Sequence, residues 1–414
     1  MGTCPLQLDL WEAIDRWPSE LPLAAVVAGD GEAGWSMLGL PSRFCEDLAE
    51  VVSCPVAPPS TPTRLPTAPG WIGAMSYEHG WSVATGAAGH AFGARTLRTP
   101  RHSTLPRACF ARIDSALVLD HATGAWSELG HARLSERLMA PTVRPFVRGQ
   151  WRSTTGKEAY LAAVERTLEY IRAGDIYQAN IAHELVATFE GDPLGWFAAR
   201  ARVARPRYGA YLQAPSFALA SLSPELFLEY DPTTRRLSTR PMKGTRAGAD
   251  GHASLVASLK DRAELAMIVD LLRNDLGRVC ELGSVRVDEP RAIERHGTGD
   301  ASLLQATALV GGRRRDDRSL LDAVNACFPC GSVTGAPKAR AMQVIEELEA
   351  MPRGMYCGSM GFIGDDGLMR LNVAIRTATF TPGTISYSVG AGIVADSDPE
   401  TEWQETLIKA KAAG

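Results

Sequence analysis

Residues 328–338 read Phe-Pro-Cys-Gly-Ser-Val-Thr-Gly-Ala-Pro-Lys and lead directly into an amphipathic run over residues 337–351. Backbone N–H groups at the start of a helix have no partner within the helix and could hold an anion such as a carboxylate. The segment lacks the Gly-Lys-Ser/Thr ending of a phosphate-binding loop, so we do not expect a nucleotide site. Cys327 and Cys330 form a lone C-x-x-C without a second pair, which argues against zinc or redox chemistry.

Helical and strand-like patterns alternate on both sides of this segment. Apolar periodicity predicts helices over residues 157–173, 262–276 and 399–411, and strands within residues 216–230, 356–363, 371–380 and 384–389. Short turns between the later strands favour antiparallel pairing over βαβ units. A connector-like stretch, residues 139–155, is expected to divide the chain into an N-terminal lobe, residues 1–145, and a second region, residues 146–414.

Composition narrows the class of protein. The chain has 414 residues, 45% of them hydrophobic and 22% charged, as in ordinary globular proteins. Its 43 basic and 47 acidic side chains leave a net charge of −4, which argues against nucleic-acid binding. We see neither a membrane span nor a secretory signal. Eight cysteines without framework spacing are expected to be reduced thiols, which predicts a cytoplasmic protein.

Two kinds of charged residue stand out as candidates for chemistry. Lys243 precedes Gly-Thr after a strand-like run, so its amine could point into a cavity, although an exposed turn lysine is the simpler interpretation. Two carboxylate pairs at i,i+3 spacing, Asp261 with Glu264 and Glu402 with Glu405, each share a helical face. Oxygen ligands from two helices would suit Mg²⁺; the alternative is two solvated faces. Residues 389–392, Val-Gly-Ala-Gly, could form an anion cradle or a tight turn.

Taken together and in order, these segments resemble the chorismate-utilising enzymes, and within them the synthase components of aminodeoxychorismate synthases. The resemblance extends from about Thr154 to Lys411 and is weaker over the first 140 residues. The motifs that carry it are Gly-Asp-Ile-Tyr-Gln-Ala-Asn at 174–180, Ser-Pro-Glu at 223–225, Pro-Met-Lys-Gly-Thr at 241–245, residues 262–277, residues 328–338, Tyr-Cys-Gly at 356–358, Arg-Thr-Ala at 376–378, and residues 390–405.

The resemblance implies an α+β fold in which two facing, mainly antiparallel β-sheets are flanked by helices, with an active-site cleft between lobes. It also implies that residues 146–414 bind chorismate. Family members that add water at C2 have a lysine at the position of Gln178, and those that add ammonia at C2 have an alanine at the position of Lys243. The combination of Gln178 and Lys243 therefore implies amination at C4, giving 4-amino-4-deoxychorismate for 4-aminobenzoate and folate synthesis.

By the same resemblance, Lys243 attacks C2 to form a covalent adduct, and Glu225 acts as the general acid. Mg²⁺ would bind the ring carboxylate, held by Glu264, Glu402 and Glu405 with Asp261 nearby. The groups expected to hold the substrate's carboxylates are Arg376, Tyr356, Lys409, Thr245, Ser332, Thr334 and the backbone at Gly390, Ala391 and Gly392. A separate glutamine amidotransferase subunit would supply ammonia, and an aminodeoxychorismate lyase would act next.

One expected residue is missing. Relatives have a His-Leu-Val-Ser stretch after the helix at 262–277, which we align with residues 299–305, Gly-Asp-Ala-Ser-Leu-Leu-Gln. The nearest histidine is His296, and Asp300 or Ser302 could take over a hydrogen bond. Two alternatives therefore stay open: a chorismate aminase that makes 2-amino-2-deoxyisochorismate or anthranilate, and a homologue that binds chorismate or a partner without catalysis.

Overall fold

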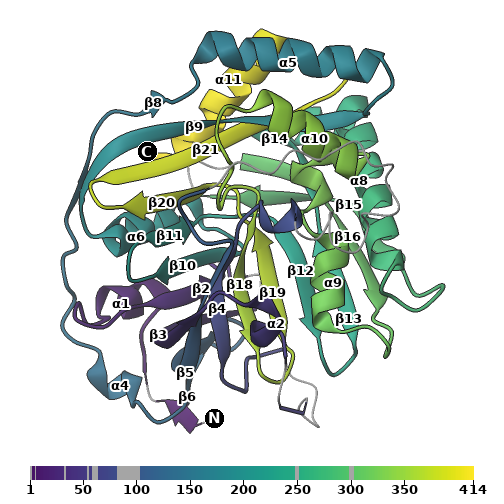
Figure 1. Cartoon of the computed structure of the whole chain (residues 1–414). Helices are drawn as coiled ribbons and strands as arrows, with labels where there is room; N and C mark the ends of the chain where they lie inside the picture. Colours follow the sequence, from purple (N-terminus) through teal and green to yellow (C-terminus); the bar gives the residue numbers. More distant parts are fainter. Residues whose placement is uncertain are drawn as a thin grey trace.

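The computed structural model describes residues 2–4, 6–31, 34–53, 56–57, 64–81, 103–247, 251–297 and 303–414. Helices and strands are mixed along the chain, as an α+β fold requires (Figure 1). The strands are β1 (Gly2–Cys4), β2 (Ala24–Val27), β3 (Trp35–Cys45), β4 (Gly70–Met75), β5 (Ala108–Asp120), β6 (Ala125–Leu129), β7 (Phe146–Arg148), β8 (Arg152–Ser153), β9 (Gln178–Gly191), β10 (Gly209–Gln213), β11 (Ala218–Ser221), β12 (Leu226–Asp231), β13 (Arg236–Arg240), β14 (Met242–Ala247), β15 (Arg286–His296), β16 (Leu303–Arg313), β17 (Gly335–Ala336), β18 (Ser359–Gly364), β19 (Met369–Val373), β20 (Thr377–Thr381) and β21 (Thr384–Ile393).

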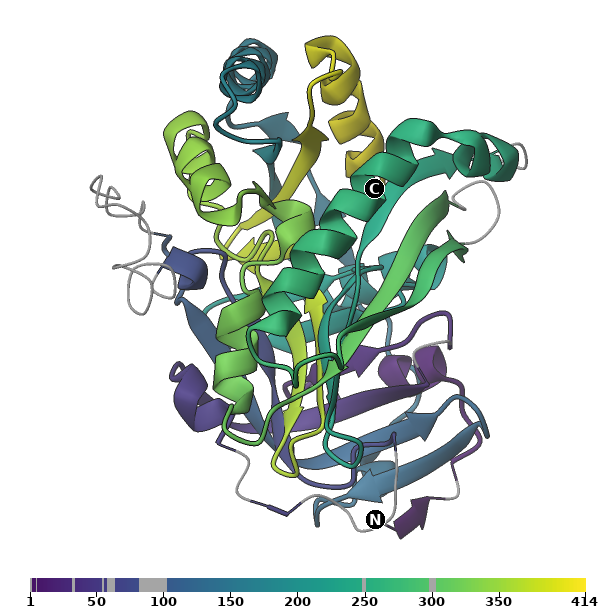
Figure 2. The ribbon, with the colours of Figure 1, turned by 90° about the vertical axis from the view of Figure 1, so that its right-hand side faces the viewer.

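The helices gather mainly on one side of these strands, where α5, α8, α9, α10 and α11 lie (Figures 1 and 2). Their bounds, with those of the smaller helices, are α1 (Leu10–Asp15), α2 (Leu48–Val51), α4 (Leu134–Arg137), α5 (Lys157–Arg172), α6 (Pro193–Ala204), α7 (Gly251–Ala257), α8 (Leu259–Gly277), α9 (Leu320–Cys327), α10 (Lys338–Leu348), α11 (Pro399–Ala410) and the 3-10 turns η2 (Gly331–Val333) and η3 (Lys411–Ala413).

The strands form one antiparallel network with two arms that start at β5. One arm runs β5–β3–β2–β10–β11–β20–β21–β9, and the other runs β5–β4–β18–β19–β12–β13–β16. β14 and β15 both pair with β16. The arms face each other, since β2 contacts β4 and β18. The predicted α+β fold is confirmed, and the two facing sheets are the two arms of this network.

Apolar side chains fill the space between the arms and the space under the helices. Met37, Ile72, Leu212 and Phe362 belong to one core cluster formed by residues of both arms. A second cluster joins Ile268 of α8 to α9 and the neighbouring strands. Further clusters hold α5, α10 and α11 on β9 and β21. This packing fixes α8 and α11, the two helices that carry the predicted acids.

Local signals explain where the two acid-bearing helices start. The Ser258 hydroxyl caps α8 by accepting from the Asp261 N–H. The Asp398 carboxylate caps α11, and Pro399 occupies its first turn. By contrast, no described side chain caps α10, the helix expected over residues 337–351, which begins after Pro337. The nearby Thr334 hydroxyl donates to the Cys330 carbonyl at 2.9 Å.

The expected boundary near residue 145 is crossed by the sheet. β2 pairs with β10, and β4 pairs with β18, so both sides of that boundary share one hydrogen-bonded network. The division into residues 1–145 and 146–414 stays a prediction. In the described ranges, we find no helix with the length and apolar character needed to cross a membrane.

Candidate active site

Lys243, Gln178 and Gly392 come together from three different strands. A Cβ built on Gly392 of β21 would lie 3.1 Å from the Lys243 Nζ of β14 and 3.1 Å from the Gln178 Nε2 of β9. A side chain at position 392 would therefore crowd both groups, which explains a glycine there. Burial lowers the pKa of Lys243, with the Glu264 carboxylate opposing that shift. The lowered pKa favours the neutral amine, the form that acts as a nucleophile.

Gln178 is buried beside this amine with an unsatisfied side chain. It has no exposed surface, and neither its Oε1 nor its Nε2 has a hydrogen-bond partner in the described part of the structure. A buried amide without partners is costly, and such groups in native proteins usually have a functional explanation. A bound ligand beside Lys243 would supply the missing partners.

Glu225 lies just before β12 and is 2% exposed. Its Oε1 accepts a hydrogen bond of 2.6 Å from the Ser332 hydroxyl of η2. Burial raises the pKa of Glu225 to about 7, although Ser332 and Lys243 act in the opposite direction. A carboxyl group with this pKa is half protonated near neutral pH and can donate a proton.

Arg376 lies between β19 and β20, is half-buried, and makes no carboxylate salt bridge among the described residues. Burial lowers its pKa. Its backbone is in the left-handed region, φ 50°, and its carbonyl accepts from the Leu222 N–H at 2.9 Å. Its Nη2 lies 3.4 Å from the Gln305 Oε1, a long contact with a neutral group. A partly buried cation without a matching anion is suited to bind one.

A second set of candidate anchors surrounds β21. The Lys409 Nζ of α11 donates to the Gly390 carbonyl at 2.8 Å and lies 2.7 Å from the Glu405 carboxylate. Tyr356 is 7% exposed, and its hydroxyl would lie 2.8 Å from a Cβ at position 390. β21 therefore brings Gly390, Ala391 and Gly392 beside side chains from α11, β9 and β14.

The four acids differ in their surroundings. Glu402 is 5% exposed and accepts from the Ser397 hydroxyl at 2.6 Å. Burial raises the pKa of Glu402 and of Glu264. Burial also acts to raise the pKa of Glu405, but Lys409 outweighs it and the pKa falls. Asp261 is instead paired with Arg246 at 2.8 Å.

Carboxylate oxygens are the ligands that a hard cation such as Mg²⁺ prefers. A nearby divalent ion would stabilise the ionised form of buried carboxylates whose pKa values are raised. Glu264 and Glu402 match this description, whereas the Glu405 carboxylate is paired with Lys409 and the Asp261 carboxylate with Arg246. Within the described ranges, no group of three His, Cys, Asp or Glu side chains is arranged so that it could hold a metal ion. The metal site therefore stays a prediction.

Two predicted substrate contacts have other partners in the structure. Ser332 donates to Glu225, and Thr334 closes the turn at Cys330, so both hydroxyls are already engaged. Thr245 remains suited to its predicted role, since its Oγ1 accepts from the Gln305 Nε2 at 3.1 Å.

Gln305 is the site residue that the sequence did not indicate. It lies directly opposite Thr245 on β16, 60 residues away along the chain. The alignment of the missing histidine pointed instead to Asp300 and Ser302, which lie outside the described residues. The sequence offered one indication of its importance, which is that Gln305 is a polar residue within a mostly apolar stretch, residues 303–310.

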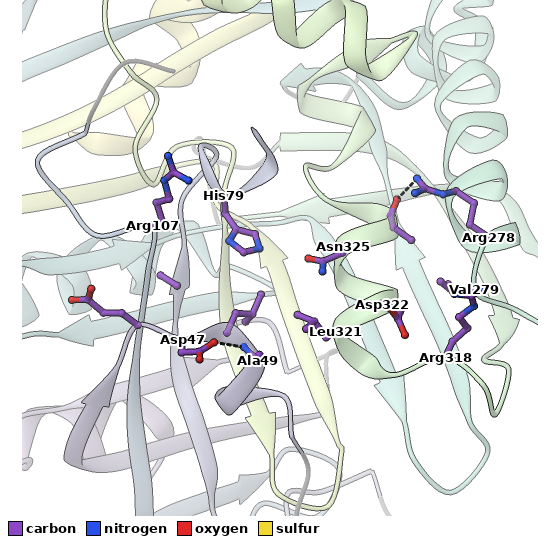
Figure 3. Close-up of a pocket in the computed structure, with 14 residues that line it drawn as sticks. Asp47, Ala49, His79, Arg107, Arg278, Val279, Arg318, Leu321, Asp322 and Asn325 are labelled. Carbon is purple, nitrogen blue, oxygen red and sulfur yellow. Dashed lines mark hydrogen bonds between the residues drawn. The ribbon is translucent and has the colours of Figure 1, made fainter. Parts of the chain in front are cut away.

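An open hollow of about 750 Å³ lies elsewhere, between α2, α9 and the end of α8 (Figure 3). Its lining includes His79, Arg107, Arg278, Arg318 and Asn325, and none of the candidate site residues. Acidic residues also line it, so its charge is mixed. The catalytic candidates thus lie away from this hollow, around β9, β14 and β21.

Comparisons with known proteins identify the family to which this chain is similar. A family model described as chorismate binding enzyme matches residues 45–413. Anthranilate synthase component 1 1 of Haloarcula marismortui is 42% identical over 263 residues, 62% of this chain and 53% of that protein. Aminodeoxychorismate synthase component 1 of Salmonella typhimurium is 36% identical over 323 residues, 75% of this chain and 70% of that protein.

A solved structure supports the fold over the whole length. Anthranilate synthase component I from Streptococcus pneumoniae matches with a TM-score of 0.75 at 24% identity, covering 100% of this chain and 99% of that chain. The match to the archaeal relative, however, spans only about half of that protein's length.

Proposed function

Since the chain belongs to the family of chorismate-binding enzymes, we propose that it is the synthase component of an aminodeoxychorismate synthase. It would convert chorismate and ammonia to 4-amino-4-deoxychorismate. The observation that carries this proposal is the Lys243 amine, half-buried beside the unpartnered Gln178 amide at Gly392.

Lys243 would act as a nucleophile. Its neutral Nζ attacks C2 of chorismate, the ring double bonds shift, and the C4 hydroxyl leaves as water after it receives a proton. Ammonia then attacks C4, the double bonds shift back, and the C2–N bond to Lys243 breaks. The amine returns to its starting state once the excess proton is lost, and the product carries nitrogen at C4. The lowered pKa of Lys243 supports this role.

Glu225 would supply the proton for the departing hydroxyl. Its pKa of about 7 keeps a large protonated fraction at neutral pH, and its burial keeps competing water away. Ser332 holds one carboxyl oxygen, which leaves the other to face the substrate.

Arg376, Tyr356 and Lys409 would bind the two carboxylates of chorismate. Arg376 offers a half-buried positive charge, and Lys409 lies at the Gly390 backbone. Glu264, Glu402 and Glu405 would hold Mg²⁺, which when bound supplies positive charge for the ring carboxylate. Asp261 would act only through its contact with Arg246.

Ammonia would come from a partner. Relatives that are named as component 1 imply a second component, and we propose a glutamine amidotransferase subunit in that place. An aminodeoxychorismate lyase would then release 4-aminobenzoate from the product. We propose a cytoplasmic location for this pathway step.

A second candidate function is supported by the names of several relatives. Anthranilate synthase components reach 42% and 43% identity, so amination at C2 is the alternative reaction.

One assay separates these functions. The protein is incubated with chorismate, Mg²⁺ and an ammonium salt, with and without added aminodeoxychorismate lyase. We expect 4-aminobenzoate that depends on the lyase. Anthranilate or 2-amino-2-deoxyisochorismate would support the alternative, and chorismate binding without consumption would mean that the chain does not catalyse amination.

A further inference from the structure

Gln305 occupies the middle of a row of three neighbouring strands. On β16 it lies directly opposite Thr245 of β14 on one side and Glu294 of β15 on the other. Directly paired residues in antiparallel strands share one face of the sheet, so these three side chains lie on the same face. Gln305 is 5% exposed, so its amide must be satisfied by protein or by ligand.

The two ends of the Gln305 amide contact two different site residues. Its Nε2 donates to the Thr245 Oγ1 at 3.1 Å, and its Oε1 lies 3.4 Å from the Arg376 Nη2. A threonine hydroxyl that accepts a hydrogen bond keeps its own proton free to donate elsewhere. Gln305 therefore leaves both Thr245 and Arg376 able to donate to a ligand.

Glu294, the acidic residue of this row, pairs with other arginines and not with Arg376. The Glu294 carboxylate lies 2.9 Å from the Arg207 Nη1 and also accepts from Arg240. His296, its neighbour on β15, has a pKa lowered to about 3 by burial and by Arg376 and Arg207, so it is neutral. A neutral amide thus contacts Arg376 where an ionised acid would cancel its charge.

We propose that Gln305 is a positioning residue for anion binding. It fixes the Arg376 guanidinium through Oε1 and directs the Thr245 hydroxyl through Nε2, so that both donate to one carboxylate of the substrate. A glutamine is suited to this because it organises both donors without neutralising the cation. This inference rests on the proposed function, in which that carboxylate belongs to chorismate.

The test compares Gln305→Glu and Gln305→Leu with the wild type by calorimetric titration of chorismate in Mg²⁺ without ammonia. Glutamate has nearly the same shape as glutamine but places a negative charge beside Arg376. We expect Kd to rise about tenfold or more for Gln305→Glu and about three- to tenfold for Gln305→Leu. Gln213→Glu, the same change at an exposed position on β10, should leave Kd unchanged.

Two further readouts separate positioning from a structural role. In steady-state assays KM should rise while kcat stays within about threefold, because the anchor binds ground state and transition state alike. In an Arg376→Ala background, Gln305→Leu should raise Kd less than it does in the wild type, because only the contact with Thr245 is then lost. Unchanged Kd in both single variants, or fully additive losses in the double variant, would overturn the inference.

The binding assay also keeps this inference separate from the proposed reaction. A wild-type protein that binds chorismate and forms no C4-aminated product would contradict the reaction and leave the Gln305 test intact. Normal C4 amination with unchanged Kd in both Gln305 variants would contradict only the positioning role.

Discussion

The Ser332 hydroxyl donates to the Glu225 carboxylate at 2.6 Å and thereby joins the turn before α10 to the residue before β12. The Cys330 Sγ lies 3.2 Å from the same hydroxyl. A donor stabilises the ionised carboxylate, so Ser332 lowers the pKa of Glu225 while burial raises it to about 7. This hydrogen bond therefore opposes the effect of burial on the pKa of Glu225 and narrows the pH range in which Glu225 is protonated.

Replacing Ser332 by alanine should shift the pH profile toward alkaline values. Loss of the donor destabilises the ionised form of Glu225, so its pKa rises, by about one unit if the bond contributes about 1.5 kcal/mol. The activity that falls as Glu225 ionises should then persist to higher pH. The measurement is kcat/KM for chorismate against pH at a fixed concentration of free ammonia. A shift of this limb to lower pH would contradict the assignment.

Glu225→Gln should abolish the same limb and slow the reaction. An amide of the same shape cannot give a proton to the departing hydroxyl, so kcat should fall by about 10²- to 10⁴-fold. Chorismate affinity, measured by titration without ammonia, should change little. A variant with normal kcat would remove Glu225 from the mechanism.

Glu264→Gln and Glu402→Gln should weaken Mg²⁺ binding without unfolding the protein. Each substitution removes one negative oxygen ligand from the proposed site. Calorimetric titration of Mg²⁺ in the presence of chorismate should give a Kd at least about tenfold higher in each variant. Glu400→Gln serves as the matched control, because Glu400 lies on α11 but pairs with Lys157 at the surface. Full wild-type activity in EDTA would contradict a magnesium requirement.

Lys338→Met should destabilise the fold. The Lys338 Nζ lies 2.7 Å from the Asp275 carboxylate, which is 3% exposed, and joins the start of α10 to α8. Removing the cation leaves a buried charge uncompensated, at a cost of about 3–5 kcal/mol. Burial already raises the pKa of Asp275, so the loss should grow as pH rises and the carboxyl ionises. Urea unfolding at two pH values measures both effects.

The double variant Lys338→Met with Asp275→Leu provides the control. An apolar pair leaves no buried charge, so part of the lost stability should return. If the double variant is less stable than Lys338→Met alone, the buried-charge explanation is wrong.

The sequence predicted the helices that carry the site better than the contacts within it. Periodic apolar residues predicted helices where the structure has α8 and α11. Glu264 and Glu402 therefore lie on the expected helices. The antiparallel strands were expected as well. The sequence did not predict that both arms of the network meet at β5, because strand pairing depends on partners far apart in the chain.

The hydrogen-bond and ion-pair partners of the site residues were harder to predict from the sequence. Ser332 and Thr334 were expected at the substrate, but hydroxyls accept and donate equally well, and nearby groups engage both. Asp261 shares a helical face with Glu264, yet Arg246 from β14 pairs with it. Gln305 could not be predicted, because only the register of β14 on β16 brings it to Thr245.

Mass spectrometry of the protein after incubation with chorismate and Mg²⁺ in the absence of ammonia tests the role of Lys243 most directly. A C2–N bond to Lys243 with loss of the C4 hydroxyl predicts an increase equal to chorismate less one water, on the peptide that contains Lys243. The increase should disappear after ammonium is added and should be absent in Lys243→Ala. C4-aminated product from Lys243→Ala, or wild-type turnover with the modification on another residue, would contradict the account.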